Sequence, residues 1–221
     1  MPLHHARFQD ATHYPEPISK VVCVGRNYAA HARELDNPVP TQPLLFIKPP
    51  STLQNLHEGI DLPADRGPVH YETEVALLIG QNLTRASADQ TMAAVAGVGL
   101  ALDLTLRERQ SELKKEGYPW EIAKAFDGAC PLSEFVRPES LPMPDRFRFG
   151  LNIDGEERQH GDTAEMLKPI PELLAYMSQH FSLWPGDVVL TGTPAGVGVI
   201  EPGQELELHL EKQLRLLSRV R

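Results

Sequence analysis

The chain has 221 residues and a formal net charge of −9 at pH 7, so it is long enough to bury one sizeable core but short for two independent domains. The acidic balance and the lack of a Lys/Arg-rich run argue against nucleic acid or an anionic membrane as a partner and favour small molecules. No apolar stretch approaches the length of a membrane span, and the start, "MPLHHARFQD", lacks the layout of a secretory signal. We therefore expect a cytoplasmic protein.

Two features of the composition bear on the fold. Twenty prolines and sixteen glycines interrupt short extended runs, which predicts a mostly β chain with inserted helices, of the α+β class. The cysteines, Cys23 and Cys130, lie far apart in apolar segments. They form neither a disulfide framework nor a zinc pattern, and we expect two buried thiols.

The expected elements alternate between short strands and a few helices. The pairs Ser87/Gln90 and Thr105/Glu108 resemble capping boxes at the starts of two of the helices, and Gly117 closes the second of these. Alternating leucines at 206, 208 and 210 indicate a last strand with one buried face. In chain order the segments are strand 20–25, helix 26–37, strands 44–50 and 69–80, helix 88–97, strand 98–105, helix 106–117, strand 147–155, helix 170–181 and strands 187–193 and 204–210.

The strand "VHYETEVALLIG" (69–80) carries Glu72 and Glu74 two residues apart, and side chains two apart share one face of a strand. Two carboxylates at the mouth of a buried segment repel each other, and they are costly to bury without a cation or another partner. The alternative is a solvated edge strand with two exposed acids.

Asp103 is the second unusual acid, because it interrupts the apolar run "LALDLT". It either caps the helix that follows or joins Glu72 and Glu74. Three carboxylates around one cation form an all-oxygen site that suits Mg²⁺ or Mn²⁺ rather than zinc.

Lys124 in "EIAKAFDGACP" is bracketed by apolar residues, and Lys48 in "FIKPP" repeats the pattern. Such lysines are often surface side chains with an extended stem. Beside a carboxylate site, Lys124 could instead stabilise a developing enolate.

His31 and Glu34 stand three apart in "NYAAHARELD", so they share a helical face on which the carboxylate can orient the imidazole. A chance surface pair is the alternative. The segment "TGTPAGVG" (191–198) lacks the ending of a phosphate loop and is a turn, although its amides and Thr193 could hold a carboxylate.

Together, the segments "GRNYAAHARELDNPVPTQPLLFIKPPSTL", "VHYETEVALLIG", "GLALDLTLRERQ", "PWEIAKAFDGACP" and "TGTPAGVG" resemble the fumarylacetoacetate hydrolase family, in its short branch of acylpyruvate hydrolases and oxaloacetate decarboxylases. The resemblance begins near Lys20. It implies a rolled, mostly β fold like the C-terminal domain of that family, a catalytic domain over 20–221 with an N-terminal extension (1–19) packed on it, and a homodimer. The large amino-terminal domain of the true fumarylacetoacetate enzymes is absent.

The resemblance also implies roles for individual residues. Glu72, Glu74 and Asp103 would hold Mg²⁺ or Mn²⁺, and the segment with His31 and Glu34 would be a mobile lid that activates water. Lys124 would stabilise charge on the substrate. The remaining implied substrate-binding positions are Arg26, Lys48, Arg107, Gln110 and Thr193.

We therefore predict metal-dependent carbon–carbon cleavage of small 2-oxo acids, by acylpyruvate hydrolysis, oxaloacetate decarboxylation or both, through an enolate. The first alternative is an isomerase or hydratase of 2-hydroxydienoate or 2-hydroxymuconate-type acids. A non-catalytic, metal-stabilised binding module is the second.

Overall fold

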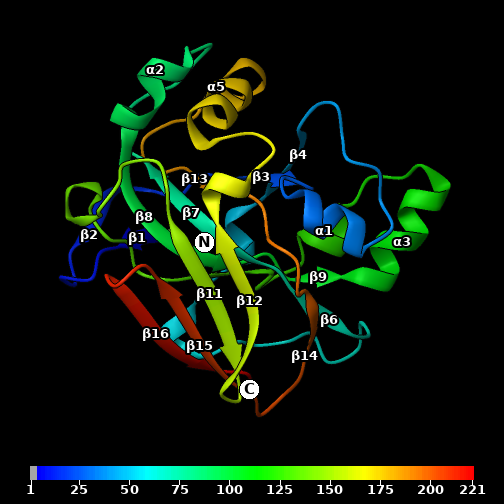
Figure 1. Cartoon of the computed structure of the whole chain (residues 1–221). Coiled ribbons are helices and arrows are strands. Elements are labelled where there is room, and N and C mark those ends of the chain that lie inside the picture. Colours follow the sequence, from blue (N-terminus) through cyan, green and yellow to red (C-terminus); the bar gives the residue numbers. More distant parts are fainter. Residues whose placement is uncertain (1–3) are drawn as a thin grey trace.

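The largest sheet of the computed structural model joins strands from both halves of the chain, within residues 4–221, which the structure describes (Figure 1). Its seven strands follow the spatial order β4 (Leu44–Lys48), β3 (Val21–Gly25), β13 (Val188–Leu190), β7 (Thr73–Ile79), β8 (Val95–Leu102), β10 (Cys130–Leu132) and β5 (Leu53–Asn55). Strand β13, an interior strand, pairs parallel with β3 and antiparallel with β7. Every residue of β7 is buried, because both faces of this strand are covered.

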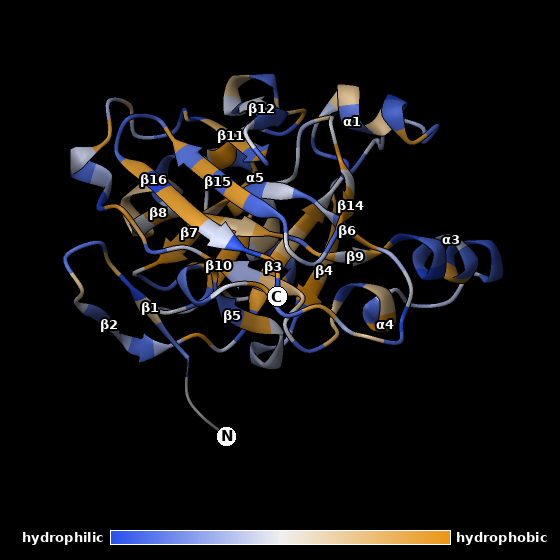
Figure 2. Cartoon of the chain, turned by 90° about the horizontal axis from the view of Figure 1, so that it is seen from below, coloured by the Kyte–Doolittle hydropathy of each residue, from blue (hydrophilic) through white to orange (hydrophobic). Residues whose placement is uncertain are grey.

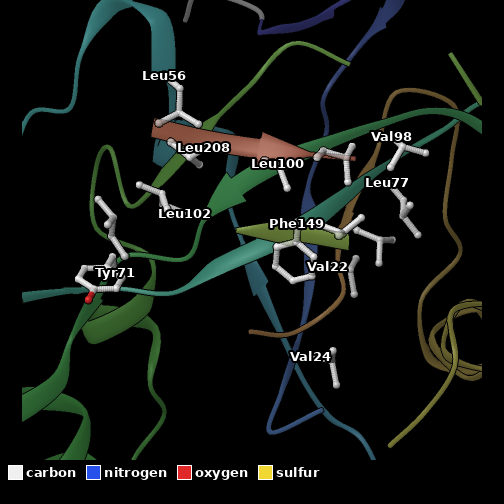
Figure 3. Close-up of a cluster of buried hydrophobic side chains, with 14 of the residues drawn as sticks. Val22, Val24, Leu56, Tyr71, Leu77, Val98, Leu100, Leu102, Phe149 and Leu208 are labelled. Atoms are coloured by element: carbon white, nitrogen blue, oxygen red, sulfur yellow. The ribbon is translucent and has the colours of Figure 1, made fainter. Parts of the chain in front are cut away.

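A four-stranded antiparallel sheet lies across the first one and closes the core. Its order is β12 (Glu156–Asp162), β11 (Arg148–Ile153), β15 (Glu205–Leu210) and β16 (Leu214–Arg219). The predicted buried face of the strand at 204–210 is confirmed, since its three leucines are buried. Figure 3 shows Leu208 of β15 and Phe149 of β11 beside Leu100 and Leu102 of β8, all in one buried cluster.

Smaller elements cover the ends of the two sheets. Helix α2 (Ala88–Thr91) packs against α5 (Ile170–His180), and the Thr91 hydroxyl donates a hydrogen bond to the Pro171 carbonyl. On another side lie α1 (Ala29–Glu34), α3 (Arg107–Glu116) and α4 (Glu121–Lys124), with the three-stranded sheet β14 (Gly198–Ile200), β6 (Val69–Tyr71) and β9 (Thr105–Leu106) (Figure 1). Figure 2 shows α3 as a hydrophilic helix at the edge of the molecule, whereas the strands of the large sheet are hydrophobic.

The N-terminal hairpin consists of β1 (His5–Arg7) and β2 (His13–Pro17). It contacts the rest of the fold through backbone hydrogen bonds and buried hydrophobic side chains. The amide of Phe135 donates to the Arg7 carbonyl at 2.8 Å, and Phe8 and Phe135 belong to one buried cluster. Residues 1–3 of the predicted extension lie outside the described residues.

The boundaries predicted between residues 88 and 106 were partly wrong. The Ser87/Gln90 capping box is confirmed, but the helix ends early and β8 begins at Val95, because Val95 already pairs with Ile79 of β7. Thr105 does not cap a helix. It lies in β9 and donates its hydroxyl hydrogen bond to the Asp103 carbonyl, and α3 begins two residues later without a side-chain cap.

Other predictions missed whole strands or overran their ends. The segment 26–37 contains only the short helix α1, and 187–193 is a strand only as far as Leu190. The strand at 204–210 is not the last, because β16 follows it and pairs with it. The hairpin β1–β2 and strand β12 were not predicted. The sequence of β12, "EERQHGD", lacks apolar alternation because most of that strand faces solvent.

Two predictions from composition can be compared directly with the structure. Cys23 and Cys130 are free, buried thiols as expected, and burial raises the pKa of both. Among residues 4–221, no helix is both long and apolar enough to cross a membrane.

Candidate active site

Three buried carboxylates meet where β6, β7 and β8 come together. Glu72 lies between β6 and β7, Glu74 lies in β7, and Asp103 follows the last residue of β8. The antiparallel pairing of Glu74 with Ala101, and a 2.8 Å hydrogen bond from the Asp103 amide to the Glu72 carbonyl, bring the acids together. One carboxylate oxygen from each acid lies within 4.8 Å of the others.

Three cations compensate part of this negative charge, and one of them, Lys48, lies 2.8 Å from Asp103 Oδ1. Lys124 Nζ lies 2.8 Å from Glu72 Oε2 and 2.5 Å from Asp103 Oδ2. The Arg107 guanidinium donates a hydrogen bond to Glu72 Oε1. The predicted surface alternative for Lys124 is therefore not the one seen, because its side chain is buried between two acids.

The carboxylates differ strongly in their electrostatic surroundings. Burial acts to raise the pKa of Glu72, but the charges of Lys124 and Arg107 outweigh it and hold this pKa well below its ordinary value. For Glu74, burial and the neighbouring charges of Asp103 and Glu72 all act in one direction and raise its pKa well above the ordinary value. Glu74 is thus the acid whose charge is least compensated by the protein.

The donor set fits a hard divalent cation. It consists only of carboxylate oxygens, which suit Mg²⁺ or Mn²⁺. Glu74 Oε2 accepts a 2.6 Å hydrogen bond from the Gly192 amide. Within the described part of the chain, Asp103 Oδ1 has no well-aligned hydrogen-bond donor, although Lys48 Nζ lies 2.8 Å away as a charge contact. The buried triad therefore offers a set of carboxylate oxygens that suits a divalent metal, and Glu74 is the acid in it with the raised pKa.

Lys48, predicted to bind substrate, lies behind the acids instead of on the cavity surface. Its side chain is completely buried, and Nζ donates to the backbone carbonyls of Lys124, at 3.0 Å to Ala129, and at 3.4 Å to Leu104. Together with the contact to Asp103, these bonds tie β4 to the segment that carries Asp103 and to the end of α4 at Lys124. This geometry makes Lys48 a positioning residue.

His31 and Glu34 form the predicted pair on α1. Nδ1 of His31 lies 3.3 Å from Glu34 Oε2, and the Gly196 amide donates to Glu34 Oε1 at 2.9 Å. Gly196 cannot be replaced without movement, because its φ is +97° and an added Cβ would collide with the Arg158 carbonyl oxygen. The carboxylate is therefore anchored at one end by the glycine turn and orients the imidazole at the other.

Burial lowers the pKa of His31, although Glu72 and Glu34 act to raise it. The imidazole is therefore neutral near pH 7, as a proton acceptor must be. In the tautomer that carries its hydrogen on Nδ1, the imidazole donates to the Glu34 carboxylate, and Nε2 is the basic nitrogen.

Most of the predicted site residues line a single cavity above the carboxylates. They come from the loop after β3, from α1, β7, α3 and α4, and from the glycine turn. The lining includes Arg26, His31, Glu72, Glu74, Arg107, Gln110, Lys124 and Thr193. Glu34 reaches the site through His31, while Asp103 and Lys48 contact each other and are buried behind the residues that line the cavity.

Sequence reasoning missed several lining or supporting residues. Lys114 and Trp120 line the same cavity. Lys114 could have been found from its spacing, because it follows Arg107 and Gln110 at i, i+3 and i+7 on one face of α3. Gln159 bonds the Thr193 hydroxyl at 2.8 Å and accepts the Thr73 amide at 2.9 Å, but it lies in a strand that the sequence did not reveal.

Comparison with known proteins decides the family. The model of the fumarylacetoacetate (FAA) hydrolase C-terminal family matches residues 20–221. The chain belongs to this family. The fold is therefore the rolled β fold of the family's C-terminal domain, as predicted.

Several relatives cover nearly the whole chain. The oxaloacetate tautomerase YcgM of Escherichia coli K12 is 51% identical over 196 residues, which are 88% of this chain and 90% of that protein. A mitochondrial oxaloacetate tautomerase of Homo sapiens is 40% identical over 200 residues, 90% of each chain. With such relatives, the chain is an enzyme of this family.

Solved structures agree with this grouping. A family protein from Yersinia pestis CO92 superposes with a TM-score of 0.96 at 44% identity, over 99% of this chain and 100% of that one. The fumarylpyruvate hydrolase of Pseudomonas aeruginosa, solved with Mn²⁺ and pyruvate, gives a TM-score of 0.91 at 33% identity, over 100% and 97% of the two chains.

Proposed function

We propose that this enzyme interconverts the enol and keto forms of oxaloacetate in a reaction that depends on Mg²⁺ or Mn²⁺. The observation that carries the proposal is the neutral, buried His31 held by Glu34 at the cavity that also contains Lys124 and the three acids. The names of two relatives at 51% and 40% identity support oxaloacetate as the substrate.

The chain's own residues supply the proton transfers. In the keto-to-enol direction, His31 Nε2 accepts the proton from C3 of the 2-oxo acid, while the C3–H electron pair moves to form the C2–C3 double bond and the negative charge passes to the 2-oxygen. The Lys124 ammonium stabilises this oxyanion. Glu34 stabilises the imidazolium that forms. Uptake of a solvent proton by the 2-oxygen then gives the enol while the imidazolium returns its proton to solvent, and the same steps in reverse restore the keto acid.

Glu72, Glu74 and Asp103 would hold the divalent ion. When bound, such an ion polarises the 2-oxo group as a Lewis acid. Arg107 and Gln110 lie beside this layer, with Arg107 Nη1 donating to Gln110 Oε1 at 2.9 Å. Arg107 Nε is a buried donor with no acceptor among residues 4–221, so it remains available to a substrate carboxylate.

Carbon–carbon cleavage of 2-oxo acids is the second candidate. The P. aeruginosa fumarylpyruvate hydrolase with Mn²⁺ and pyruvate supports it, as does the ability of a His–Glu pair to activate water. Both reactions pass through a stabilised enolate. The binding module without catalysis is not retained, since the chain is an enzyme of the family.

The test follows both reactions in one cuvette. Enol oxaloacetate absorbs in the ultraviolet, so its ketonisation by the purified chain with Mg²⁺ is read directly, while pyruvate release is measured with a coupled dehydrogenase. Ketonisation above the buffer rate without equal pyruvate release supports the tautomerase. Pyruvate release at the same rate as enol loss would favour cleavage. If neither ketonisation above the buffer rate nor pyruvate release is observed, both candidates are contradicted.

We also propose that residues 20–221 form a single catalytic domain on which the extension 1–19 packs, and that the chain is a homodimer. The contacts of Arg7 and Phe8 with Phe135 support the packing of the extension.

A further inference from the structure

Two cations at the cavity lack the acidic partners that the others have. Lys48, Lys124 and Arg107 each contact a buried carboxylate. By contrast, among residues 4–221 no carboxylate lies within 4.0 Å of the charged nitrogens of Arg26 or Lys114, although both side chains line the cavity. Both are partly buried, unlike the exposed lysines of the surface.

Arg26 is held in place by strong constraints. Its φ is +59°, a left-handed conformation that is uncommon for a residue with a side chain and that tends to occur at functional sites. The next residue fixes the loop, because the Asn27 side chain donates to the carbonyls of Thr191 at 3.0 Å and Lys168 at 3.1 Å. Arg26 Nη2 donates to the neutral Asn37 Oδ1 at 2.5 Å, so its positive charge stays unneutralised.

Lys114 is positioned by an aromatic wall. It lies in the last turn of α3, on the same face as Arg107 and Gln110, and its Nζ is 5.0 Å from the centre of the Trp120 ring. That contact favours a cation over the ring face and limits the directions the ammonium can take. Phe46, which lines the same cavity, lies 6.4 Å from Trp120, ring centre to ring centre.

The surroundings of Lys114 carry an excess of positive charge. Burial, followed by the charges of Arg26, Arg107 and Lys124, lowers the pKa of Lys114 to about 8, and only Glu72 opposes them. The mutual repulsion of cations that have no acidic partner decreases when an anion binds beside them. In the proposed function, the 2-oxo end of the acid binds at the three carboxylates. The other end of the acid then lies toward Arg26 and Lys114.

We propose that Arg26 and Lys114 form a subsite for the distal carboxylate of the substrate, so that the enzyme selects dianionic 2-oxo acids over those with a neutral end. The inference rests on the proposed function, because it assumes that a 2-oxo or 2-hydroxy acid occupies the cavity. It extends that function by identifying the residues with which the enzyme would distinguish a dicarboxylic substrate from an acylpyruvate with an apolar end.

Two stable acids test the subsite without turnover. Malate and 2-hydroxybutyrate share the 2-hydroxy acid end and differ in that a carboxylate of malate is a methyl group in 2-hydroxybutyrate. We would titrate each into the purified chain with Mg²⁺ and measure its dissociation constant by calorimetry. The parent enzyme should bind malate more tightly by at least about 10-fold, the size of one charge-assisted hydrogen bond.

Variants assign the preference to the two residues. Lys114→Met should weaken malate binding by on the order of 10-fold or more and leave 2-hydroxybutyrate unchanged, and Arg26→Gln should act in the same direction. Lys114→Arg, which keeps the charge, should retain most of the preference. Lys115→Met is the matched control, since this neighbour on α3 is exposed and lies outside the cavity lining.

The outcomes separate the subsite from the proposed function. Equal affinity of the parent enzyme for the two acids, or an equal loss of both in Lys114→Met, would overturn the subsite while the function stands. The subsite is also overturned if Lys114→Met binds malate as tightly as the parent does. Failure of both acids to bind the parent enzyme would overturn the ligand class and the subsite with it.

Discussion

Nζ of Lys124 lies 2.5 Å from Oδ2 of Asp103, in a layer where both side chains are almost completely buried. This ammonium contacts two of the three acids, and the proposed reaction requires it to stabilise an enolate.

The first prediction removes that charge. Lys124→Met keeps most of the side-chain length, and we expect it to lower both oxaloacetate ketonisation and pyruvate release by on the order of 10²- to 10³-fold, the usual cost of losing one oxyanion donor. Steady-state assays of both reactions check this. Lys115→Met, exposed on α3, should match the parent. Parent-like rates in Lys124→Met would remove this lysine from the mechanism.

The second prediction concerns the metal and the acid with the raised pKa. In chelator, Glu74→Gln should melt at a higher temperature than the parent near pH 7. A carboxyl whose folded pKa is raised costs stability once the pH passes its unfolded pKa, and the amide carries no charge. A gain of about 1 kcal/mol corresponds to roughly 2–4 °C for a chain of this size.

Excess Mg²⁺ supplies the control for that melt. The parent should gain stability from the ion by mass action, whereas Glu74→Gln should gain much less and should lose metal-dependent turnover. A variant that is less stable than the parent in chelator, or equally stabilised by Mg²⁺, would contradict the assignment of Glu74 as a ligand.

The third prediction uses the His31–Glu34 pair to distinguish the candidate reactions. His31→Ala should reduce ketonisation of oxaloacetate and hydrolysis of an acylpyruvate by on the order of 10²- to 10⁴-fold, because both need a proton acceptor. Decarboxylation of oxaloacetate needs only enolate stabilisation and should fall markedly less. Arg33→Ala, an exposed change on the same helix, is the control. If all three activities fall equally, His31 acts in binding or in closing the site rather than as a base.

The fourth prediction concerns pH. Lys114 has a pKa lowered to about 8 by burial and by neighbouring cations, so its charge is present below pH 8 and is lost as the pH rises through that value. Malate should therefore bind more weakly at pH 9 than at pH 7 in the parent. The decline should be absent in Lys114→Met and smaller in Lys114→Arg. An identical decline in all three proteins would trace the pH effect to another group.

The fifth prediction is the homodimer. Light scattering after size exclusion should give twice the chain mass of 24.6 kDa. A mass of one chain at every concentration would contradict it.

The site was more predictable from the sequence than its scaffold was. Glu72, Glu74 and Asp103 are acids within apolar, strand-forming runs, and burying a charge there requires a reason. Strand β12 offered no such contrast, because a mostly exposed strand of polar residues looks like a loop in sequence. Gln159, which holds Thr193, was lost with it.

The roles of the lysines depend on the third dimension. Lys48 and Lys124 both sit among apolar neighbours in sequence, yet one lies under the acids and the other between two of them. Which carbonyls surround Lys48 is set by strand pairings between distant segments. Lys114 was missed for another reason, since the lysine pair in "ELKKEG" was not compared with the helical face of Arg107 and Gln110, which includes Lys114 and excludes Lys115.

Strand β13 arrives late in the chain but takes an interior place between β3 and β7. During synthesis, a nascent chain that ends before Val188 therefore holds two strands whose facing edges have no partner, and such edges are prone to pair with other chains. Two residues beyond the end of this strand, Gly192 supplies the amide bonded to Glu74. The same short segment thus completes the sheet and the acid cluster, so synthesis of Val188 to Gly192 both pairs the exposed strand edges and supplies the amide bonded to Glu74.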